Sequence, residues 1–159
     1  KPGIIFRDIT SVLRDADGLR LAVDEMTQCI GDTQFDAIVG LESRGFLFGM
    51  PMAYNLHKAV IPVRKRGKLP RETAHISYDL EYGSAEIEVH KEDITPGMRV
   101  VVVDDLIATG GTLEAAIKLL EGLGAKVVKV VCLLELKGLH GRDRLGVYPM
   151  EIVIAYEGK

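Results

Sequence analysis

The sequence predicts an α/β protein with a mostly parallel central sheet flanked by helices. Short β-rich runs alternate with segments of helical periodicity, an order that is typical of parallel sheets. Residues 100–103 form an unbroken run of valines, without the alternation of apolar and polar residues that a strand with one exposed face has. We therefore expect this strand to be buried on both faces.

Five short apolar runs are candidate strands. They are residues 37–41, 59–63, 99–103, 126–134 and 152–155. Ligands of parallel α/β sheets bind beyond the carboxyl ends of the strands. We therefore expect functional residues after Leu41, Val63 and Val103.

Three helices are predicted between these strands. The first has Leu19, Val23, Met26 and Ile30 at helical spacing. The second covers residues 46–56, which are mostly apolar, and the third begins near residue 113 and ends at Gly122 or Gly124.

Residues 64–90 lack a helical pattern and are expected to form a long loop with a hairpin. An excursion of this length in a compact domain is commonly a lid over a site, and we place this lid at about residues 66–90. The chain of 159 residues has the size of a single domain, residues 1–159.

Composition excludes several classes of function. The net charge of -3 provides no general attraction to nucleic acid or to an anionic membrane, and the apolar runs are too short to cross a bilayer. No signal-peptide pattern opens the chain, so we expect a soluble cytoplasmic protein. Cys29 and Cys132 have neither disulfide nor zinc-site spacing, and the four histidines suggest no metal site.

The turn after the valine run has the residues of a phosphate site. Backbone N–H groups from Ala108 to Thr112 can converge on a phosphate at the start of the next helix, where the helix dipole favours negative charge. Gly110 and Gly111 permit the close approach and positive φ that such a turn needs, and Thr109 and Thr112 add hydroxyl donors. The ATP-binding P-loop requires a lysine that is absent here, which favours a monophosphate.

Asp104 and Asp105 precede this turn. Adjacent carboxylates repel one another unless donors or cations meet them, and a ribose diol with a nearby divalent metal provides both. The motif therefore predicts binding of a ribose 5-phosphate. The alternative is that the acids merely end a strand and the two glycines merely turn the chain.

The run VVVVDDLIATGGT resembles the 5-phosphoribosyl 1-pyrophosphate (PRPP) motif of the type I phosphoribosyltransferases. Residues 3–9, 40–46, 62–70 and 77–83 also resemble the adenine-specific members of this family. The resemblance implies the type I phosphoribosyltransferase fold, with a flexible hairpin lid and a small N-terminal hood at about residues 1–12. It also implies transfer from PRPP to adenine in purine salvage, giving AMP and pyrophosphate, with Mg²⁺ bound mainly through PRPP or pyrophosphate, in a homodimer.

The family resemblance also implies how the base is held. Phe6 in the hood would stack on the purine, while Ile5 and Arg7 offer backbone groups to its edge and Leu106 closes the other face. A flat neutral base suits such an apolar sandwich. Without the resemblance, Phe6 reads as an ordinary core residue.

Two segments are expected to bind pyrophosphate. Ser43 and Arg44 lie between a predicted strand and helix, and in related enzymes this loop can contain a cis peptide. Arg64, Lys65 and Lys68 belong to a dense basic turn after a predicted strand. The alternatives are a surface ion pair between Glu42 and Arg44, and a solvated basic turn.

Within the predicted lid, the resemblance assigns catalysis to Glu81, which would handle a proton of the purine, and closure of the site to Tyr82. A carboxylate enclosed beside an aromatic base has a raised proton affinity, which suits acid–base work. Two other functions stay open: transfer to another base, such as xanthine, hypoxanthine or orotate, and a non-catalytic PRPP-sensing regulator.

Overall fold

The computed structural model describes residues 9–80 and 82–158. Its helices and strands are, in order, α2 (Ile9–Leu13), α3 (Ala16–Ile30), β1 (Ala37–Leu41), α4 (Arg44–Leu56), β2 (Ala59–Lys65), β3 (Thr73–Leu80), β4 (Gly83–His90), β5 (Arg99–Ile107), α5 (Gly111–Gly122), β6 (Lys126–Leu136), α6 (Gly141–Arg144) and β7 (Met150–Tyr156). Two short 3₁₀ turns, Lys91–Asp93 and Lys137–Leu139, complete the order.

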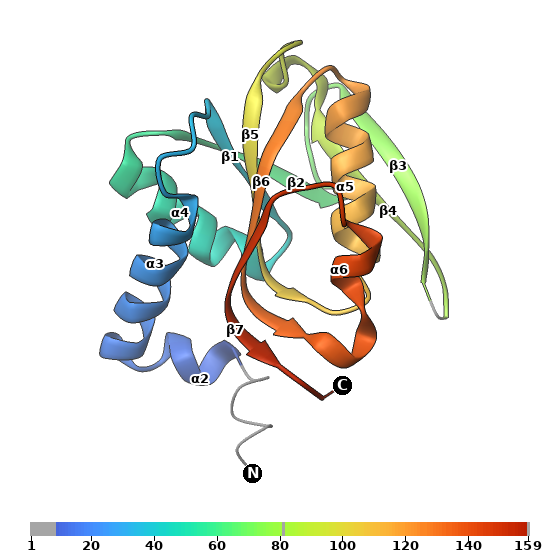
Figure 1. Cartoon of the computed structure of the whole chain (residues 1–159). Coiled ribbons are helices and arrows are strands. Elements are labelled where there is room, and N and C mark those ends of the chain that lie inside the picture. Colours follow the sequence, from blue (N-terminus) through green and yellow to red (C-terminus); the bar gives the residue numbers. More distant parts are fainter. Residues whose placement is uncertain (1–8, 81, 159) are drawn as a thin grey trace.

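The strands form one seven-stranded sheet in the order β3-β4-β2-β1-β5-β6-β7 (Figure 1). The pairs β2–β1, β1–β5, β5–β6 and β6–β7 are parallel, and the hairpin of β3 and β4 adds two antiparallel strands beside β2. The predicted mostly parallel sheet is confirmed.

The sheet is covered on both faces, which explains the valine run. Val100 and Val102 belong to the hydrophobic cluster under α5, whereas Val101 and Val103 belong to the cluster under α3 and α4. All four valines are fully buried. Successive side chains of a strand point to opposite faces, so a central strand needs apolar residues at every position.

β1 has the predicted bounds, and the other four predicted strands are longer than the sequence indicated. β5 continues through Asp104 and Asp105 to Ile107, because β6 pairs with it as far as Ile107↔Glu135. β2 likewise continues to Lys65, where it pairs with Ile87 of β4. The sequence pattern identifies only the apolar part of each strand. The extensions of β5 and β2 begin with polar residues, so they were not predicted.

The predicted hairpin is present, but its base belongs to the core. Residues 87–90 of β4 are buried, and Arg64 of β2 pairs with Glu88. Only the distal part projects beyond the sheet (Figure 1). A moving segment would therefore be shorter than the predicted lid of residues 66–90.

The short helix α2 covers part of the predicted hood. Ile9 is buried in the cluster that lies under α3 and α4. The rest of the predicted hood, residues 1–8, lies outside the described residues. None of the helices formed by residues 9–80 and 82–158 has both the length and the apolar composition that a bilayer crossing needs.

Candidate active site

The two central parallel strands place the site. The helix that follows β1, α4, packs on one face of the sheet, and the helix that follows β5, α5, packs on the other (Figure 1). The chain therefore leaves these adjacent strands in opposite directions, which opens a crevice at their carboxyl ends. The segments after Leu41 and after Val103 flank this crevice.

A cavity of about 450 Å³ occupies this edge of the sheet, and we call it the sugar cavity. The loop after β1 contributes Ser43 and Arg44, and the end of β5 contributes the two aspartates. The full lining is Glu42, Ser43, Arg44, Lys65, Asp104, Asp105, Leu106 and Thr112. The fold thus brings together residues from three of the predicted binding segments.

A smaller hollow of about 100 Å³ adjoins it, and we call it the phosphate cup. Its lining is Asp104, Leu106, Ala108, Thr109, Gly110, Gly111, Thr112 and Leu113. Gly110 has a φ of 85° and immediately precedes α5, so the free N–H groups of the first helical turn open beside it. This geometry suits a phosphate.

Glycine at position 45 lets the two halves of the site approach one another. A Cβ on Gly45 would lie 2.8 Å from the carbonyl oxygen of Val103 and 3.2 Å from Oδ1 of Asp104. Any side chain would therefore push the start of α4 away from the end of β5. The preceding Glu42–Ser43 peptide is cis.

Asp105 has an acceptor oxygen that the described residues leave open. Its Oδ2 lies 2.7 Å from Nε of Arg44, but this ion pair is not aligned as a hydrogen bond, and the buried oxygen has no hydrogen-bond partner among the described residues. The backbone N–H of Asp105 donates to Oδ1 of Asp104 at 2.8 Å. A buried polar atom of this kind is expected to have a partner, so it fits a hydroxyl donor or a cation from a ligand.

Asp104 has a raised proton affinity. Burial raises the pKa of Asp104 well above its usual value of 3.8, and the negative charge of Asp105 raises it further. Arg44 opposes this shift only in part. The free energy cost of holding two acids here would fall once a ligand supplied donors or positive charge.

A divalent metal would need oxygens from the ligand as well as from the protein. No group of three or more His, Cys, Asp or Glu residues suited to a metal occurs within residues 9–80 and 82–158. Mg²⁺ typically takes one or two carboxylates plus substrate phosphates, and the open Oδ2 of Asp105 fits that pattern.

The basic turn is only partly directed to the sugar cavity. Of its three predicted ligands, Lys65 lines the cavity. The Arg64 Nε donates instead to Oε1 of Glu42 at 3.0 Å, which also accepts from the backbone N–H of Lys65. Burial alone would raise the pKa of Glu42, but these donors outweigh it and lower the pKa. The alternative pair Glu42–Arg44 is wrong, because Arg44 contacts Asp105.

Lys68 does not line the cavity either. Its backbone N–H donates to Oε2 of Glu88 at 3.1 Å, and the N–H of Leu69 donates to the same oxygen at 2.8 Å. Oε1 of Glu88 accepts from the hydroxyl of Thr73 at 3.3 Å. The buried Glu88 therefore fixes the backbone that presents Lys68.

Four predicted ligands lie outside the described residues. These are Ile5, Phe6, Arg7 and Glu81. Tyr82, which is described, is 94% exposed beside the start of β4. Their assigned roles stay predictions.

Contacts of the site also include residues that the sequence did not suggest. The hydroxyl of Thr112 donates to the hydroxyl of Tyr78 in β3 at 3.3 Å. Gly141 of α6 packs against the phosphate cup, since a Cβ there would lie 2.5 Å from the carbonyl oxygen of Ala108. No local pattern marks these contacts, because they join segments about thirty residues apart.

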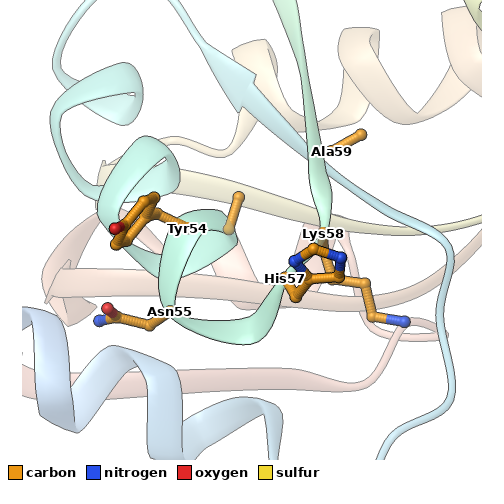
Figure 2. A pocket seen from close by; sticks show the side chains of 6 residues that line it. Tyr54, Asn55, His57, Lys58 and Ala59 are labelled. Carbon is orange, nitrogen blue, oxygen red and sulfur yellow. The ribbon is translucent and has the colours of Figure 1, made fainter.

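Another hollow, of about 650 Å³, lies where α4 ends and β2 begins (Figure 2). Its largest lining residues are Tyr54, His57 and Lys58. The Lys58 ammonium donates to the carbonyl oxygen of Phe35 at 2.9 Å and lies 4.9 Å from the centre of its ring. The cation of this hollow is thus engaged within the protein, at the strand ends opposite the sugar cavity.

The fold, the acid pair and the phosphate cup together define the phosphoribosyltransferase class. Residues 11–153 match the family model of the phosphoribosyl transferase domain. The match contains β1 to β6, every described residue of the sugar cavity and the whole phosphate cup.

Similarity to particular proteins narrows the class. An adenine phosphoribosyltransferase of Lachnoclostridium phytofermentans is 60% identical over 99% of this chain and 90% of that protein. The crystal structure of the adenine phosphoribosyltransferase from Thermoanaerobacter pseudethanolicus is 46% identical, with a TM-score of 0.91 over 94% of this chain and 87% of that one. The chain belongs to the adenine phosphoribosyltransferase family.

The enzyme of Saccharomyces cerevisiae extends the comparison. It is 39% identical, with a TM-score of 0.85 over 92% of this chain and 85% of that one. Its crystal structure is a complex with adenine and an iminoalditol bisphosphate.

Proposed function

We propose that this chain transfers the 5-phosphoribosyl group of PRPP to adenine, giving AMP and pyrophosphate in purine salvage. The observation that carries this proposal is the 60% identity to an adenine phosphoribosyltransferase over nearly the whole chain. The sugar cavity and the phosphate cup have the chemistry that such a substrate needs. The reaction also fits the ligands of the yeast relative, a base and a sugar analogue with two phosphates.

In this proposal the ribose 5-phosphate lies across the two hollows. The backbone N–H groups and hydroxyls of residues 108–112 bind the phosphate at the start of α5. Asp104 and Asp105 accept hydrogen bonds from the ribose hydroxyls. The open Oδ2 of Asp105 supports this role, because a hydroxyl donor would satisfy it.

The pyrophosphate end lies on the side of Ser43, Arg44 and Lys65. As the bond from the anomeric carbon to the pyrophosphate oxygen breaks, negative charge grows on the leaving group and positive charge grows on the sugar. Arg44 and Lys65 stabilise the leaving group. Arg64 and Lys68 belong to the same basic turn, but neither lines the sugar cavity.

Mg²⁺ is the metal that this family generally uses, and when bound it would neutralise part of the pyrophosphate charge. The carboxylates of Asp104 and Asp105 are the groups of the sugar cavity that fit it. Most of its ligands would be oxygens of PRPP or pyrophosphate.

The base completes the reaction when its ring nitrogen forms the new bond to the anomeric carbon and loses its proton. We propose that Glu81 accepts that proton. The residues that stack on adenine or contact its edge would be Ile5, Phe6, Arg7 and Leu106. Leu106 lines both hollows, which supports its place beside the base. Tyr82 would help to exclude water, since an activated sugar otherwise hydrolyses.

We also propose that the chain works as a homodimer in the cytoplasm. Three apolar side chains of α4 follow helical spacing along one exposed face: Leu47 is 50% exposed, Met50 58% and Tyr54 84%. A second copy would bury this face. Sedimentation velocity of the pure chain tests the proposal, and a monomer at micromolar concentration would refute it.

The activity is tested with the purified chain, Mg²⁺ and PRPP. We expect adenine to be consumed and AMP and pyrophosphate to appear in equal amounts. Competition with hypoxanthine, guanine, xanthine and orotate tests the choice of base, and preference for any of them would refute the adenine assignment. Binding of PRPP without turnover of any base would favour the non-catalytic regulator.

Glu81→Gln tests the catalytic role within the same assay. Loss of a general acid or base should lower kcat by about a hundredfold or more, with a change of less than about threefold in the Kd for PRPP. An equal loss in kcat and in PRPP affinity would mean that Glu81 binds substrate or supports the fold instead.

A further inference from the structure

The phosphate cup has a charge deficit. None of the eight described residues that line it is basic, and one of them, Asp104, is acidic. A phosphate monoester has a charge near -2 at neutral pH. The helix dipole and backbone N–H groups supply only partial positive charge, so a full cation beside the cup would strengthen binding.

The helix α6 lies against this cup. A Cβ on Gly110 would lie 2.9 Å from the carbonyl oxygen of Gly141, and a Cβ on Gly141 would lie 2.8 Å from Cγ1 of Ile107. Neither position has room for a side chain, so the segment that begins at Gly141 packs directly on the phosphate turn.

From this helix, Arg144 reaches the first residue of α5. Its Nη1 lies 3.0 Å from the position that a Cβ on Gly111 would occupy. Gly111 lines the phosphate cup and contributes one of the N–H groups of the first turn. The guanidinium of Arg144 is therefore beside the residue on which the phosphate would rest.

Arg144 also differs from the other arginines of this edge. Arg44 pairs with Asp105, Arg64 pairs with Glu42, and Arg142 pairs with Glu135. The side chain of Arg144 has no ion pair with any carboxylate of residues 9–80 and 82–158. It is an exposed cation that none of these described carboxylates neutralises.

Two residues near Arg144 in sequence, Arg142 before it and Leu145 after it, are held in place by contacts with the rest of the fold. The Nε of Arg142 lies 3.0 and 3.1 Å from the two carboxylate oxygens of Glu135, which is buried in β6. Leu145 is 2% exposed in the core under α5. Ordering these neighbours limits how far the Arg144 backbone can move, which reduces the entropy lost when its side chain binds.

We propose that Arg144 is a further binding residue for the 5-phosphate of PRPP and AMP, supplied by α6 from outside the phosphate motif. The inference rests on the proposed function, since it places that phosphate in the cup. The guanidinium donates charge-assisted hydrogen bonds to the phosphate oxygens and balances the charge that the cup itself lacks.

The test compares Arg144→Gln with Arg20→Gln in the full chain. Arg20 is an exposed arginine of α3, on the opposite face of the sheet, so its replacement removes the same charge away from the cup. We expect Arg144→Gln to raise the KM for PRPP and the inhibition constant of AMP by about tenfold, the size of a partly screened hydrogen bond to a charged group. Arg144→Lys should recover part of this loss, and Arg20→Gln should change neither constant.

Two further constants separate phosphate binding from a structural role. The inhibition constant of pyrophosphate and the KM for adenine should stay within about twofold of the original values in Arg144→Gln, because neither ligand has a 5-phosphate. A parallel rise in all four constants would overturn the inference, and so would unchanged constants for PRPP and AMP. Unchanged constants in a variant that still converts adenine would leave the proposed function standing, whereas an inactive unsubstituted chain would refute that function itself.

Discussion

Buried carboxylates occur in two places near the carboxyl ends of the parallel strands, and they differ in how many hydrogen-bond donors they have. Glu88 in β4 accepts from two backbone N–H groups and from the Thr73 hydroxyl. Burial tends to raise the pKa of Glu88, but these donors outweigh burial and lower the pKa. At the end of β5, burial and Asp105 raise the pKa of Asp104. Oδ2 of Asp105 forms an ion pair with Arg44 but has no hydrogen-bond partner within residues 9–80 and 82–158.

The difference separates support from binding. A carboxylate whose acceptors are all used by the protein stabilises the fold and has little left for a ligand. An acid pair that the described residues satisfy only in part costs stability, and a ligand with hydroxyl groups or positive charge relieves that cost. Glu88 therefore fixes the basic turn, whereas Asp104 and Asp105 keep acceptor capacity for a ligand, which our proposal assigns to the ribose.

The largest effect that would sharpen this contrast is expected for the double substitution Asp104→Asn with Asp105→Asn. Losing two charge-assisted hydrogen bonds to the ribose should weaken PRPP binding by about a hundredfold, measured by calorimetry. The thermal unfolding temperature should not fall. Unaltered PRPP affinity would remove the ribose role from the acid pair.

Glu88→Gln should mainly affect stability. The neutral amide keeps one acceptor oxygen but loses the charge that the N–H groups of Lys68 and Leu69 meet, so we expect a loss of about 2 kcal/mol in the free energy of unfolding. Glu86→Gln is the control, because its ion pair with Arg66 is half-exposed and should contribute less than about 1 kcal/mol. Urea unfolding measures both.

The stability lost in Glu88→Gln should depend on pH with a defined sign. Because the folded pKa of Glu88 is lowered from 4.5, its stabilising effect is present above pH 4.5 and disappears as the pH falls through the folded value. The difference between the original chain and the variant should therefore shrink in acid. A difference that grew in acid would contradict the satisfied state of Glu88.

The single substitution Asp104→Asn should act in the opposite direction on stability. The folded pKa of Asp104 is raised from 3.8, so its favourable contribution is present below pH 3.8 and is lost as the pH rises through the folded value. Asparagine avoids that loss. We therefore expect the free energy of unfolding to rise by about 1 kcal/mol at pH 8, and this gain should shrink toward pH 4. Urea unfolding at both pH values measures this change. Destabilisation at pH 8 would contradict the view that the acid pair costs stability.

The smallest effect concerns the contact that joins the hairpin to the phosphate cup. Tyr78→Phe removes the hydroxyl that accepts from Thr112, and we expect a two- to threefold rise in the KM for PRPP, about 0.5 kcal/mol. In a chain that already has Thr112→Val, adding Tyr78→Phe should not raise the KM for PRPP further, because the hydrogen bond is already lost. Additive effects would show that Tyr78 acts through packing.

The fold class was predictable because its signals are local, and so were the acid pair and the glycine turn that our proposal assigns to the sugar phosphate. Buried strands need continuous apolar residues, and the phosphate turn needs its glycines and hydroxyls in adjacent positions. The family resemblance added the loop of Ser43 and Arg44, and the structure places this loop in the same cavity as the acid pair.

The partners of the charged side chains could not be predicted in the same way. Arg44 contacts Asp105 across 61 positions, and Arg64 contacts Glu42 across 22. Other carboxylates are nearer in sequence, such as Glu42 to Arg44 and Glu72 to Arg64, and strand order decides which carboxylate each guanidinium contacts. Lys65 lines the sugar cavity and Lys68 does not, a difference that likewise follows from the pairing of β2 with β4.

By itself, then, the sequence determined the alternating α/β order, the doubly buried central strand and the phosphate turn, because each depends on neighbouring residues. The tertiary structure alone decided that Gly45 must lack a side chain beside β5, that Glu88 supports the basic turn and that α6 brings Arg144 to the phosphate cup. These contacts join distant segments, and only sheet register and helix packing determine their distances.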